Sequence, residues 1–410
     1  MADKIDVFSF FHTADFSILL HISLWYTEAV MDIKISRAEE GELRQEVGRR
    51  SDFEAGRIKR YLAMPDLSRT PGSPIHELVK RILAIPNFKD FDVIDVPEIM
   101  AMDIVFDLFD FPADHPARSR SDSYFIDDTH VLRTHTTVMW YYWLREKSVQ
   151  KKITAGEAVG ALSYGKVYRK DEIDARHMNV FHQIDGWYLA RKEEKVIGIE
   201  DLKKVLADIA KAAFGPEVRC RFNKDVFPYT DPSLEMEVDK DGNGTWVEVL
   251  GAGVVKGRVL DNLGIDSSKW NGWAFGFGLE RLAIISMQLP DIRLLWSDDE
   301  RVKKQLVLGQ AYKEVSKYPP VVRDISFIVA KGFVPNNYFD LVREIAGDLV
   351  EEVKLTDTYE NAEKIGAGKA SYAYRITYRS VERTLTSDEV NALHAKLEAA
   401  TVKNCEATIR

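Results

Sequence analysis

Apolar residues recur at helical spacing shortly after residue 70. The apolar positions are Ile75, Leu78, Val79, Ile82 and Leu83, and they follow the 3.6-residue period of an amphipathic helix. Ser73 and Pro74 precede them, and these residue types favour a helix N-cap and the first helical position. The pattern predicts a helix that begins at Pro74. The apolar run at 91–100 predicts a strand, and Pro97 within it favours a strand end or a sheet edge.

Two pairs of apolar segments predict antiparallel strands. Residues 161–170 and 180–190 are long apolar runs joined by a polar loop. Residues 234–238 and 245–249 flank a turn rich in Asp, Asn and Gly, which is typical of a hairpin. We therefore expect residues 61–314 to form one domain of the α/β (α+β) class with much antiparallel strand.

The last hundred residues have a pattern of their own. The predicted elements are strand 324–330, helix 337–350, strand 353–360, strand 371–380, a helix from Thr386 and strand 404–409. Tyr372, Tyr374, Ile376 and Tyr378 alternate with polar residues along the third strand. Thr386 and Glu389 have the spacing of a capping box. The order βαββαβ predicts a ferredoxin-like domain at residues 315–410.

Residues 1–60 form a predicted N-terminal extension whose role the sequence leaves open. The apolar stretch 8–26 is interrupted by Asp15 and other polar residues, so neither a membrane span nor a signal peptide is expected. Acidic residues here also disfavour a mitochondrial transit peptide, which favours a cytoplasmic location and leaves the mitochondrial matrix for a eukaryotic source. Residues 39–60 are highly charged and predict a solvated helix or an arm. Met31 offers an alternative start.

Composition narrows the class of protein without naming a function. The chain has 410 residues, of which 45% are hydrophobic and 30% charged, as in an ordinary soluble globular protein. Its net charge of −9 argues against non-specific coating of nucleic acid, so an RNA contact would need a local patch. Cys220 and Cys405 are too few for a disulfide framework or a cysteine zinc site, which fits a reducing compartment.

Four segments lie on or beside the predicted strands and carry the candidate chemistry. They are residues 132–137, 165–186, 227–233 and 272–281. Side chains of equal parity on one strand point to the same side of a sheet, so Phe181, Gln183 and Asp185 share a face. The pattern Gly276-x-Gly278-x-x-Arg281 lies at a strand-to-helix junction, where helix N–H groups favour an anion.

In this order the four segments resemble the catalytic core of phenylalanyl-tRNA synthetase, a class II aminoacyl-tRNA synthetase. Residues 115–118 and 246–253 belong to the same resemblance, and residues 318–324 resemble the start of that family's anticodon-binding domain. The resemblance implies a class II synthetase antiparallel-sheet catalytic domain at 61–314 and a ferredoxin-like anticodon-binding domain at 315–410. A core joined directly to this domain is similar to the single-chain, mitochondrial-type members, which implies a monomer that requires no second subunit.

The resemblance implies a phenylalanine–tRNA ligase. Such an enzyme uses ATP to convert phenylalanine to phenylalanyl-adenylate and then transfers it to tRNA(Phe), with AMP and pyrophosphate as products. A carboxylate is already a nucleophile, so the site needs charge stabilisation and alignment rather than a general base. Two alternatives stay open: an AMP-forming amino-acid ligase of class II fold that uses no tRNA, and an inactive RNA-binding or regulatory paralogue. The ferredoxin-like domain disfavours the first, and intact Arg169, Phe181 and Arg281 disfavour the second.

The residues carried over to ATP are Arg169, Asp171, His177, Phe181, Glu248, Gly278 and Arg281. The implied catalytic residues are Arg169, His177 and Arg281. Arg169 would hold the α-phosphate and the carboxylate, for which its planar fork is suited, and His177 would reach the other phosphates. Phe181 and Arg281 would cover the two faces of adenine. Glu248 is the candidate Mg²⁺ ligand because parity places it on the inner face with Leu250, although a buried hydrogen-bonding role is the alternative.

The residues carried over to phenylalanine are His135, Thr137, Gln183, Asp185, Phe227, Tyr229, Ala274 and Gly276. The resemblance implies that Phe227 and Tyr229 sandwich the phenyl ring edge-to-face. It further implies that Ala274 and Gly276 leave the space that the ring fills. His135 and Thr137 would line the α-amino end.

Several positions depart from the family pattern. Asp171, Asp185 and Asp231 stand where the family usually has Glu, so each carboxylate has a shorter reach. Asp90 stands where class II enzymes often have Gly, which puts a standard class II dimer in doubt. On the polar side of the strand at 371–380, Arg375 and Arg379 are the candidate tRNA-binding residues, with plain solvated charge as the alternative.

Overall fold

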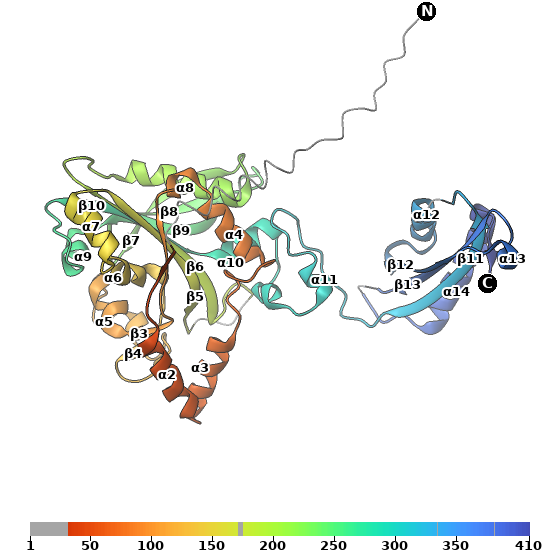
Figure 1. The fold of residues 1–410 in the computed structure, drawn as a ribbon, viewed down its shortest axis with the longest axis horizontal. Helices are drawn as coiled ribbons and strands as arrows, with labels where there is room; N and C mark the ends of the chain where they lie inside the picture. Colours follow the sequence, from red (N-terminus) through yellow and green to blue (C-terminus); the bar gives the residue numbers. More distant parts are fainter. Residues whose placement is uncertain (1–31, 171–174, 334, 381) are drawn as a thin grey trace, which may run out of the picture. The chain divides into compact units, whose positions relative to one another are not determined.

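The computed structural model describes residues 32–170, 175–333, 335–380 and 382–410, so the predicted ATP ligand Asp171 lies outside the described residues. The chain divides into two compact units, the first ending at Tyr312 and the second running from Lys313 to Arg410. Figure 1 shows a large sheet flanked by helices in the first unit and a smaller sheet with its own helices in the second. Each unit is described by itself below.

An eight-stranded sheet forms the centre of the first unit, in the order β1-β2-β5-β6-β10-β9-β8-β7. Its strands are β1 (Asp32–Lys34), β2 (Asp92–Asp95), β5 (Val159–Tyr168), β6 (Val180–Arg191), β7 (Arg219–Phe227), β8 (Thr230–Asp239), β9 (Val247–Val255) and β10 (Trp270–Gly278). β1, β2 and β5 pair in parallel, whereas the other neighbours are antiparallel. β3 (Ile99–Ala101) and β4 (His130–Leu132) form a separate antiparallel pair. The predicted α+β class with much antiparallel strand is confirmed.

Helices cover both faces of this sheet and create two hydrophobic cores (Figure 1). The first core packs against α4 (Pro74–Leu83), α8 (Ile199–Phe214) and α10 (Leu279–Met287). The second core packs against α5 (Met102–Val105), α6 (Met139–Trp143), α7 (Lys147–Ala155) and α9 (Gly257–Asn262). On β6, Ile184 belongs to the first core and Trp187 to the second. Even-numbered residues of β6 therefore face α4 and α10, and odd-numbered residues face the opposite side.

Local signals in the sequence explain several of these elements. The Ser73 side chain accepts a hydrogen bond from the Ile75 amide and caps α4, as predicted. The antiparallel pairs β5–β6 and β8–β9 are also as predicted. The single strand predicted at 91–100 is wrong, because the chain leaves β2 before Pro97 and enters β3 after it. Proline lacks the amide hydrogen that a continuous ladder would need.

Short helices complete the first unit. They are η1 (Pro86–Phe88), η2 (Asp107–Phe109), η3 (Pro116–Arg118), η4 (Thr136–Val138), η5 (Ile292–Trp296) and α11 (Glu300–Lys303). η4 follows directly after His135 and leads into α6, which buries Trp140 against Trp187 with ring centroids 4.3 Å apart. This contact fixes the segment that carries His135 and Thr137 over the sheet.

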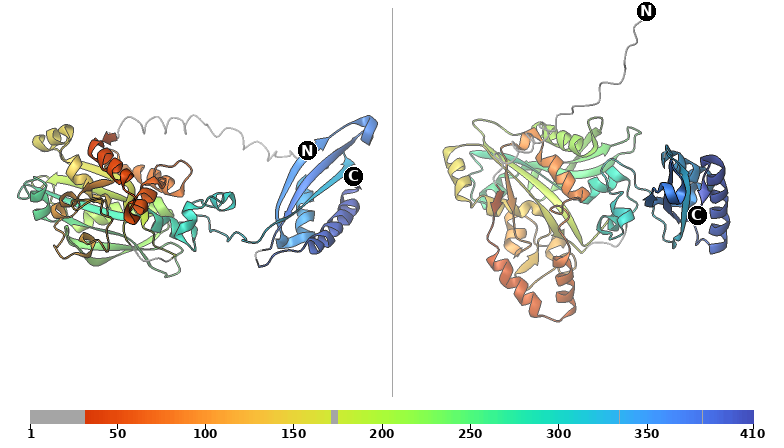
Figure 2. Two further views of the ribbon diagram at one scale, coloured as in Figure 1. Left: turned by 90° about the horizontal axis from the view of Figure 1, so that it is seen from below. Right: turned by 45° about the vertical axis from the view of Figure 1, so that its right-hand side comes forward.

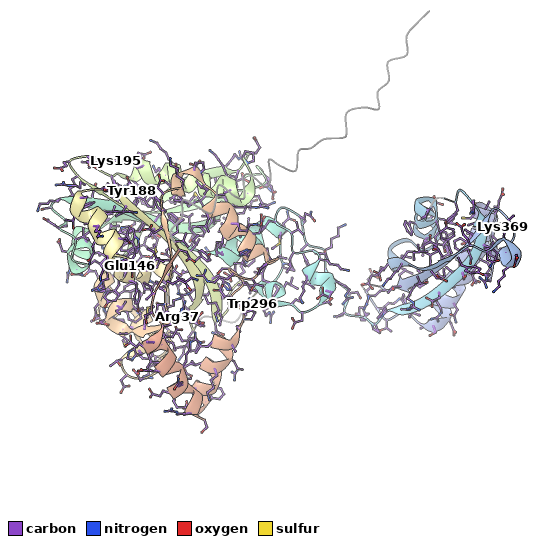
Figure 3. All side chains as sticks on the ribbon, viewed as in Figure 1. Arg37, Glu146, Tyr188, Lys195, Trp296 and Lys369 are labelled. Atoms are coloured by element: carbon purple, nitrogen blue, oxygen red, sulfur yellow. The ribbon has the colours of Figure 1, made fainter. Side chains whose placement is uncertain are left out.

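The charged segment before residue 61 is helical, which is one of the two predicted forms, but it makes two helices. It folds into α2 (Ala38–Arg49) and α3 (Phe53–Ala63), which lie side by side (Figure 2). Their buried apolar residues are Leu43, Val47, Ala55 and Ile58. Glu40 is also buried and pairs with Arg37, which Figure 3 labels, and with Arg44. The predicted solvated helix holds for most of the charged side chains, which are exposed or half-buried, and what the prediction missed is the buried apolar face and the buried Glu40.

The second unit has the predicted ferredoxin-like order. Its elements are β11 (Val321–Ala330), α12 (Pro335–Ala346), η6 (Gly347–Leu349), β12 (Val350–Tyr359), α13 (Ala362–Ile365), β13 (Lys369–Tyr378), α14 (Ser387–Cys405) and β14 (Thr408–Ile409). The antiparallel sheet has the order β12-β13-β11-β14. Tyr374, Ile376 and Tyr378 of β13 are buried against α12 and α14, and the Thr386 capping box begins α14. The last strand is shorter than the predicted 404–409, because α14 continues to Cys405.

Candidate active site

A cavity of about 620 Å³ lies over β6, β9 and β10 in the first unit. The predicted site residues that line it are His135, Arg169, His177, Phe181, Gln183, Asp185, Phe227, Tyr229, Glu248, Ala274, Gly276, Gly278 and Arg281. Segments that are far apart in the sequence therefore meet in one place. Arg375 and Arg379 belong to the second unit.

Asp185 forms the floor of this cavity and is buried. Its carboxylate accepts hydrogen bonds from the hydroxyls of Thr136 and Thr137, the second at 2.8 Å. Burial raises the pKa of Asp185 to about 6, although the two threonine hydrogen bonds oppose the rise. Thr137 was expected at the α-amino end of the substrate, but it is buried, does not line the cavity and holds Asp185.

Gly276 lies directly opposite Asp185 in the β6–β10 ladder. A Cβ at this position would overlap the Asp185 carboxylate. Gly276 lines the cavity, the space beside it is taken by the Asp185 carboxylate, and its role in making room for a substrate ring stays a prediction. Ala274, two residues earlier on β10, does line the cavity and is 3% exposed.

His135 presents a bare nitrogen in the cavity wall. Its Nε2 donates to the Val105 carbonyl at 3.0 Å, so Nδ1 carries a lone pair. Burial, aided by the nearby Arg169, lowers the pKa of His135 to about 3 and keeps the ring neutral. Within the described part of the chain, His135 Nδ1, Thr134 Oγ1 and Gln183 Oε1 are buried and have no hydrogen-bond partner. Buried polar atoms normally have partners, and these three are atoms beside the cavity to which the described protein gives no hydrogen bond.

Aromatic rings form a second wall of the cavity. The rings of Phe227 and Tyr229 are nearly parallel, with centroids 6.4 Å apart. Tyr229 also meets the edge of Trp140 at 6.3 Å. Gly251 of β9 allows Phe227 to lie flat on the sheet, since a Cβ at Gly251 would overlap the Phe227 ring. The result is a continuous aromatic surface beside the polar wall.

Two arginines and Phe181 gather at the other end of the cavity. The guanidinium carbon of Arg169 lies 5.3 Å from the Phe181 ring centroid, and Arg169 Nε donates to the Thr134 carbonyl at 2.9 Å. Arg281 follows the end of β10, where a Cβ at Gly278 would lie in ordinary contact with the Phe181 ring, 3.9 Å from its nearest atom. His177 lines the cavity near the same end, two residues after Ala175, whose carbonyl accepts a hydrogen bond from the Ile292 amide. This end offers an aromatic face together with fixed positive charge.

Glu248 does not lie on the inner face with Leu250 as parity suggested. A β-bulge between β8 and β9 breaks the alternation, so Val249 and Leu250 are both buried and the Glu248 side chain is 51% exposed. Its carboxylate lies 3.3 Å from Arg281. Among the described residues, no cluster of three or more His, Cys, Asp or Glu side chains could hold a metal by itself. One carboxylate at the cavity rim nevertheless suits Mg²⁺ that is bound mainly by substrate phosphates.

Comparisons with known proteins identify the family. The model described as "tRNA synthetases class II core domain (F)" matches residues 62–306, and "Ferredoxin-fold anticodon binding domain" matches residues 316–410. The chain is 40% identical over 334 residues to the chloroplastic/mitochondrial phenylalanine–tRNA ligase of Arabidopsis thaliana, covering 79% of this chain and 73% of that protein. The chain belongs to the phenylalanine–tRNA ligase family.

Relatives from other organisms point to the same family. The mitochondrial phenylalanine–tRNA ligase of Mus musculus is 36% identical over 355 residues, covering 78% of this chain and 74% of that protein. The mitochondrial enzyme of Saccharomyces cerevisiae is 32% identical over 384 residues, with 74% and 80% covered. Like the expected single-chain members, this chain joins the class II core directly to the anticodon-binding domain. The organellar names of these relatives give no support to the cytoplasmic location favoured above.

In the second unit of this family member, both candidate tRNA-binding arginines are paired with acidic residues. Arg375 makes two hydrogen bonds of 2.8 Å to Asp324 across β11 and β13 and remains 53% exposed. Arg379 pairs with Glu351 at 2.6 Å and donates to the Tyr318 carbonyl, and its side chain is only 14% exposed. Arg375 is therefore the more accessible of the two.

No helix in the described ranges has the length and apolarity to cross a membrane.

Sequence reasoning missed some residues of the cavity. Thr134 lies within the segment 132–137 without an expected role, yet its hydroxyl is one of the partnerless atoms. Arg176 also lines the cavity, and its position beside His177 could have drawn attention to it. Phe111 stacks on His135 with ring centroids 5.7 Å apart, and nothing in its sequence neighbourhood indicated this.

Proposed function

We propose that the cavity of the first unit activates phenylalanine with ATP and passes the aminoacyl group to tRNA(Phe). Phenylalanine–tRNA ligase activity follows from the family to which the chain belongs. The residue roles, the metal ligand, the RNA contacts and the oligomeric state are our proposals.

The observation that carries the assignment of this cavity is the partnerless polar wall beside the aromatic wall. An α-ammonium group needs acceptors, and His135 Nδ1 and Gln183 Oε1 are both bare acceptors. The phenyl ring would lie against Phe227 and Tyr229, with the Ala274 methyl as a steric limit. Asp185 would act by holding Thr136 and Thr137 and by the electrostatic attraction of its carboxylate for the ammonium group, rather than by a direct hydrogen bond to the substrate.

The charged end of the cavity suits ATP. Phe181 and Arg281 would cover the two faces of adenine, and Gly278 lines the cavity beside Phe181. Arg169 would hold the substrate carboxylate and the α-phosphate together while the carboxylate oxygen attacks phosphorus and pyrophosphate leaves. His177 would bind the departing phosphates. Fixed cations of this kind stabilise the charge of a five-coordinate phosphorus without reorganisation.

Mg²⁺ with ATP is general for this family, and we propose Glu248 as its protein ligand. Bound Mg²⁺ would neutralise charge on the phosphates. Binding would require the Glu248 carboxylate to share its oxygens with Arg281, from which it lies 3.3 Å away. We further propose that Arg375, and to a smaller extent Arg379, contact tRNA, that the protein acts as a monomer, and that it works in an organelle, as the relatives' names indicate for those proteins.

The test is ATP–pyrophosphate exchange with each amino acid, followed by aminoacylation of tRNA(Phe). Exchange that depends on phenylalanine and charging of tRNA(Phe) are the expected results. Exchange without any charging of tRNA would favour an AMP-forming amino-acid ligase. Absence of both activities from the folded protein would favour a paralogue without catalysis. Phe181→Ala and Arg281→Ala should each raise the KM for ATP, which tests the nucleotide end directly.

A further inference from the structure

His182 and Glu280 form a buried pair at the end of the cavity that holds Phe181 and Arg281. His182 follows Phe181 on β6 and has no exposed surface, and Glu280 precedes Arg281 in α10 and is 3% exposed. Strand alternation turns His182 to the face opposite Phe181, toward α4 and α10. Each member of the pair is thus adjacent in sequence to a residue assigned to ATP.

Three hydrogen bonds join the pair. The His182 backbone amide donates to both carboxylate oxygens of Glu280, each at 2.9 Å. The ring Nδ1 donates to Glu280 Oε1 at 2.6 Å. A carboxylate that accepts from both the main chain and the side chain of one residue fixes that part of the strand relative to its own helix. Hydrogen bonds to a charged acceptor are stronger than neutral ones.

The far side of the His182 ring is also held. The Leu67 amide donates to Nε2 at 2.9 Å, Asp66 Oδ1 lies 3.3 Å from the same nitrogen, and Trp296, labelled in Figure 3, stacks on the ring at 5.4 Å. Burial alone would lower the pKa of His182, but Glu280 and Asp66 outweigh it and raise the pKa to about 9. The two contacts of Nε2 belong to different states of the ring: the neutral ring accepts from the Leu67 amide, whereas the protonated ring donates from Nε2 to Asp66 and gives up the Leu67 hydrogen bond. Nδ1 carries a proton in either state, so the bond to Glu280 is present in both.

The pair lies where the backbone connection between the two strands ends. The antiparallel ladder of β6 and β10 runs as far as the Gln183–Gly278 pair, after which the chain turns into α10 at Leu279. Phe181 lies beyond the last ladder pair on one strand, and Arg281 lies beyond it on the other. The His182–Glu280 hydrogen bonds continue the connection across this gap.

We propose that His182 and Glu280 are positioning residues that set the separation of Phe181 and Arg281 for nucleotide binding. The proposal rests on the proposed function, because it takes Phe181 and Arg281 as the contacts of adenine. The two positioning residues act through the peptide units next to them and do not touch the substrate in this role. Loss of the pair should leave the phenylalanine end of the cavity in place, since Asp185 and Gly276 remain paired within the ladder.

The test measures ATP–pyrophosphate exchange by the full-length protein with ATP and phenylalanine varied separately. His182→Leu and Glu280→Ala should each raise the KM for ATP by about tenfold or more, as for loss of a hydrogen bond to a charged group, with the KM for phenylalanine little changed. His182→Asn keeps a side-chain donor and Glu280→Gln keeps an acceptor, so both should recover part of the ATP affinity. These conservative variants decide the outcome if the first two fail to fold.

The matched control is Asp92→Ala. Asp92 is buried on the same sheet and accepts a 2.9 Å hydrogen bond from Trp143 Nε1, but it does not line the cavity. Its loss should lower the melting temperature and leave the KM for ATP unchanged. Folded His182 and Glu280 variants with a normal KM for ATP would overturn the proposal, and so would an equal rise in both KM values. If Phe181→Ala and Arg281→Ala bind ATP normally, the proposed function of this end fails instead.

Discussion

The carboxylate of Asp185 occupies the space where a Cβ of Gly276 would lie, directly across the β6–β10 ladder. A glycine of the catalytic sheet therefore accommodates a protein carboxylate, and that carboxylate in turn holds Thr136 and Thr137 of η4. The amino-acid end of the cavity is thus shaped by a fit between two neighbouring strands.

Gly276→Ala should damage both stability and phenylalanine binding. The added methyl must displace a buried carboxylate, and overpacking of this kind costs about 1–3 kcal/mol. Thermal unfolding and the KM for phenylalanine in pyrophosphate exchange measure the two effects. Gly41→Ala is the control, because Gly41 lies within α2 with open space around its Cβ position, and alanine should stabilise that helix. A fully stable Gly276→Ala enzyme with normal kinetics would show that the Asp185 carboxylate does not need the space left by Gly276.

Asp185→Asn should change how stability depends on pH. The pKa of Asp185 is raised to about 6 in the folded protein, so its folded state binds a proton more tightly than the unfolded chain does. Below pH about 4 the carboxyl group is protonated in both states and does not change the free energy of unfolding. Between pH about 4 and 6 it ionises more readily in the unfolded chain, so the free energy of unfolding falls by about 3 kcal/mol in total. The asparagine variant should gain stability relative to the wild type across that range.

Asp52→Asn provides a control of opposite sign. The Arg50 side chain and the Ala55 amide lower the pKa of Asp52 to about 2, so its ionised form stabilises the fold above the unfolded pKa. Its asparagine variant should lose stability relative to the wild type as pH rises from about 2 to about 4, and the difference should then stay constant. Denaturant unfolding of both variants between pH 2 and 7.5 is the measurement; an Asp185→Asn stability that runs parallel to the wild type between pH 4 and 6 would refute the assignment for Asp185.

Arg169→Ala should reduce the rate of pyrophosphate exchange by about 10²-fold or more, as when one preformed charge-stabilising group is removed. Arg169→Lys should recover only part of the rate, because lysine keeps the charge without the planar fork. Arg191→Ala is the control, since Arg191 lies at the opposite end of β6 and pairs with Glu193. Exchange at the wild-type rate by Arg169→Ala would remove this residue from the mechanism.

Ala274→Gly should admit para-substituted phenylalanines. One methyl group in an apolar pocket changes discrimination by about tenfold or somewhat more. Ala161→Gly is the matched control, because Ala161 and Ala274 are the two cross-strand neighbours of Trp187 and only Ala274 lines the cavity. The ratio of kcat/KM for para-chlorophenylalanine and phenylalanine should rise for Ala274→Gly alone. An equal rise in both variants would indicate general loosening of the sheet.

Arg375→Ala should weaken tRNA charging and leave pyrophosphate exchange intact, because the residue lies in the second unit. Asp324→Ala is the informative partner, since it frees Arg375 from its two hydrogen bonds and should strengthen tRNA binding or leave it unchanged. Aminoacylation with tRNA varied gives the KM for tRNA in each case. Weaker charging by both variants would show that the ion pair itself, rather than Arg375, supports the domain.

Periodic patterns in the sequence predicted the elements that local signals control. The Ser73 cap, the β5–β6 pair and the Thr386 capping box all follow from residues that are close together in the chain. Parity correctly placed Phe181, Gln183 and Asp185 on one face of β6. The resemblance to a family, which rests on the order of the four segments along the chain, assigned roles to the site residues, and periodicity alone cannot assign such roles.

Other features depend on contacts that no local pattern contains. The bulge at Val249 breaks the parity on which the placement of Glu248 was based. Asp185 and Gly276 meet only because β6 and β10 are neighbours. His182 and Glu280 are 98 residues apart, and each looks like an ordinary buried residue in its own segment. The segment before residue 61 was predicted as a solvated helix or an arm, because its charged sequence does not show that it forms two helices or that Glu40 is buried beside its arginine partners.

The ion pairs on the sheet of the second unit have a consequence for the ionic-strength dependence of RNA binding. A phosphate that binds Arg375 replaces the Asp324 carboxylate, and one that binds Arg379 replaces Glu351. The displaced acid stays on the protein, and the surface gains no net cation from its arginines before RNA arrives. The affinity for tRNA should therefore fall with added salt less steeply than it would for the same arginines without acidic partners, because their carboxylates offset part of the favourable charge interaction with the phosphates.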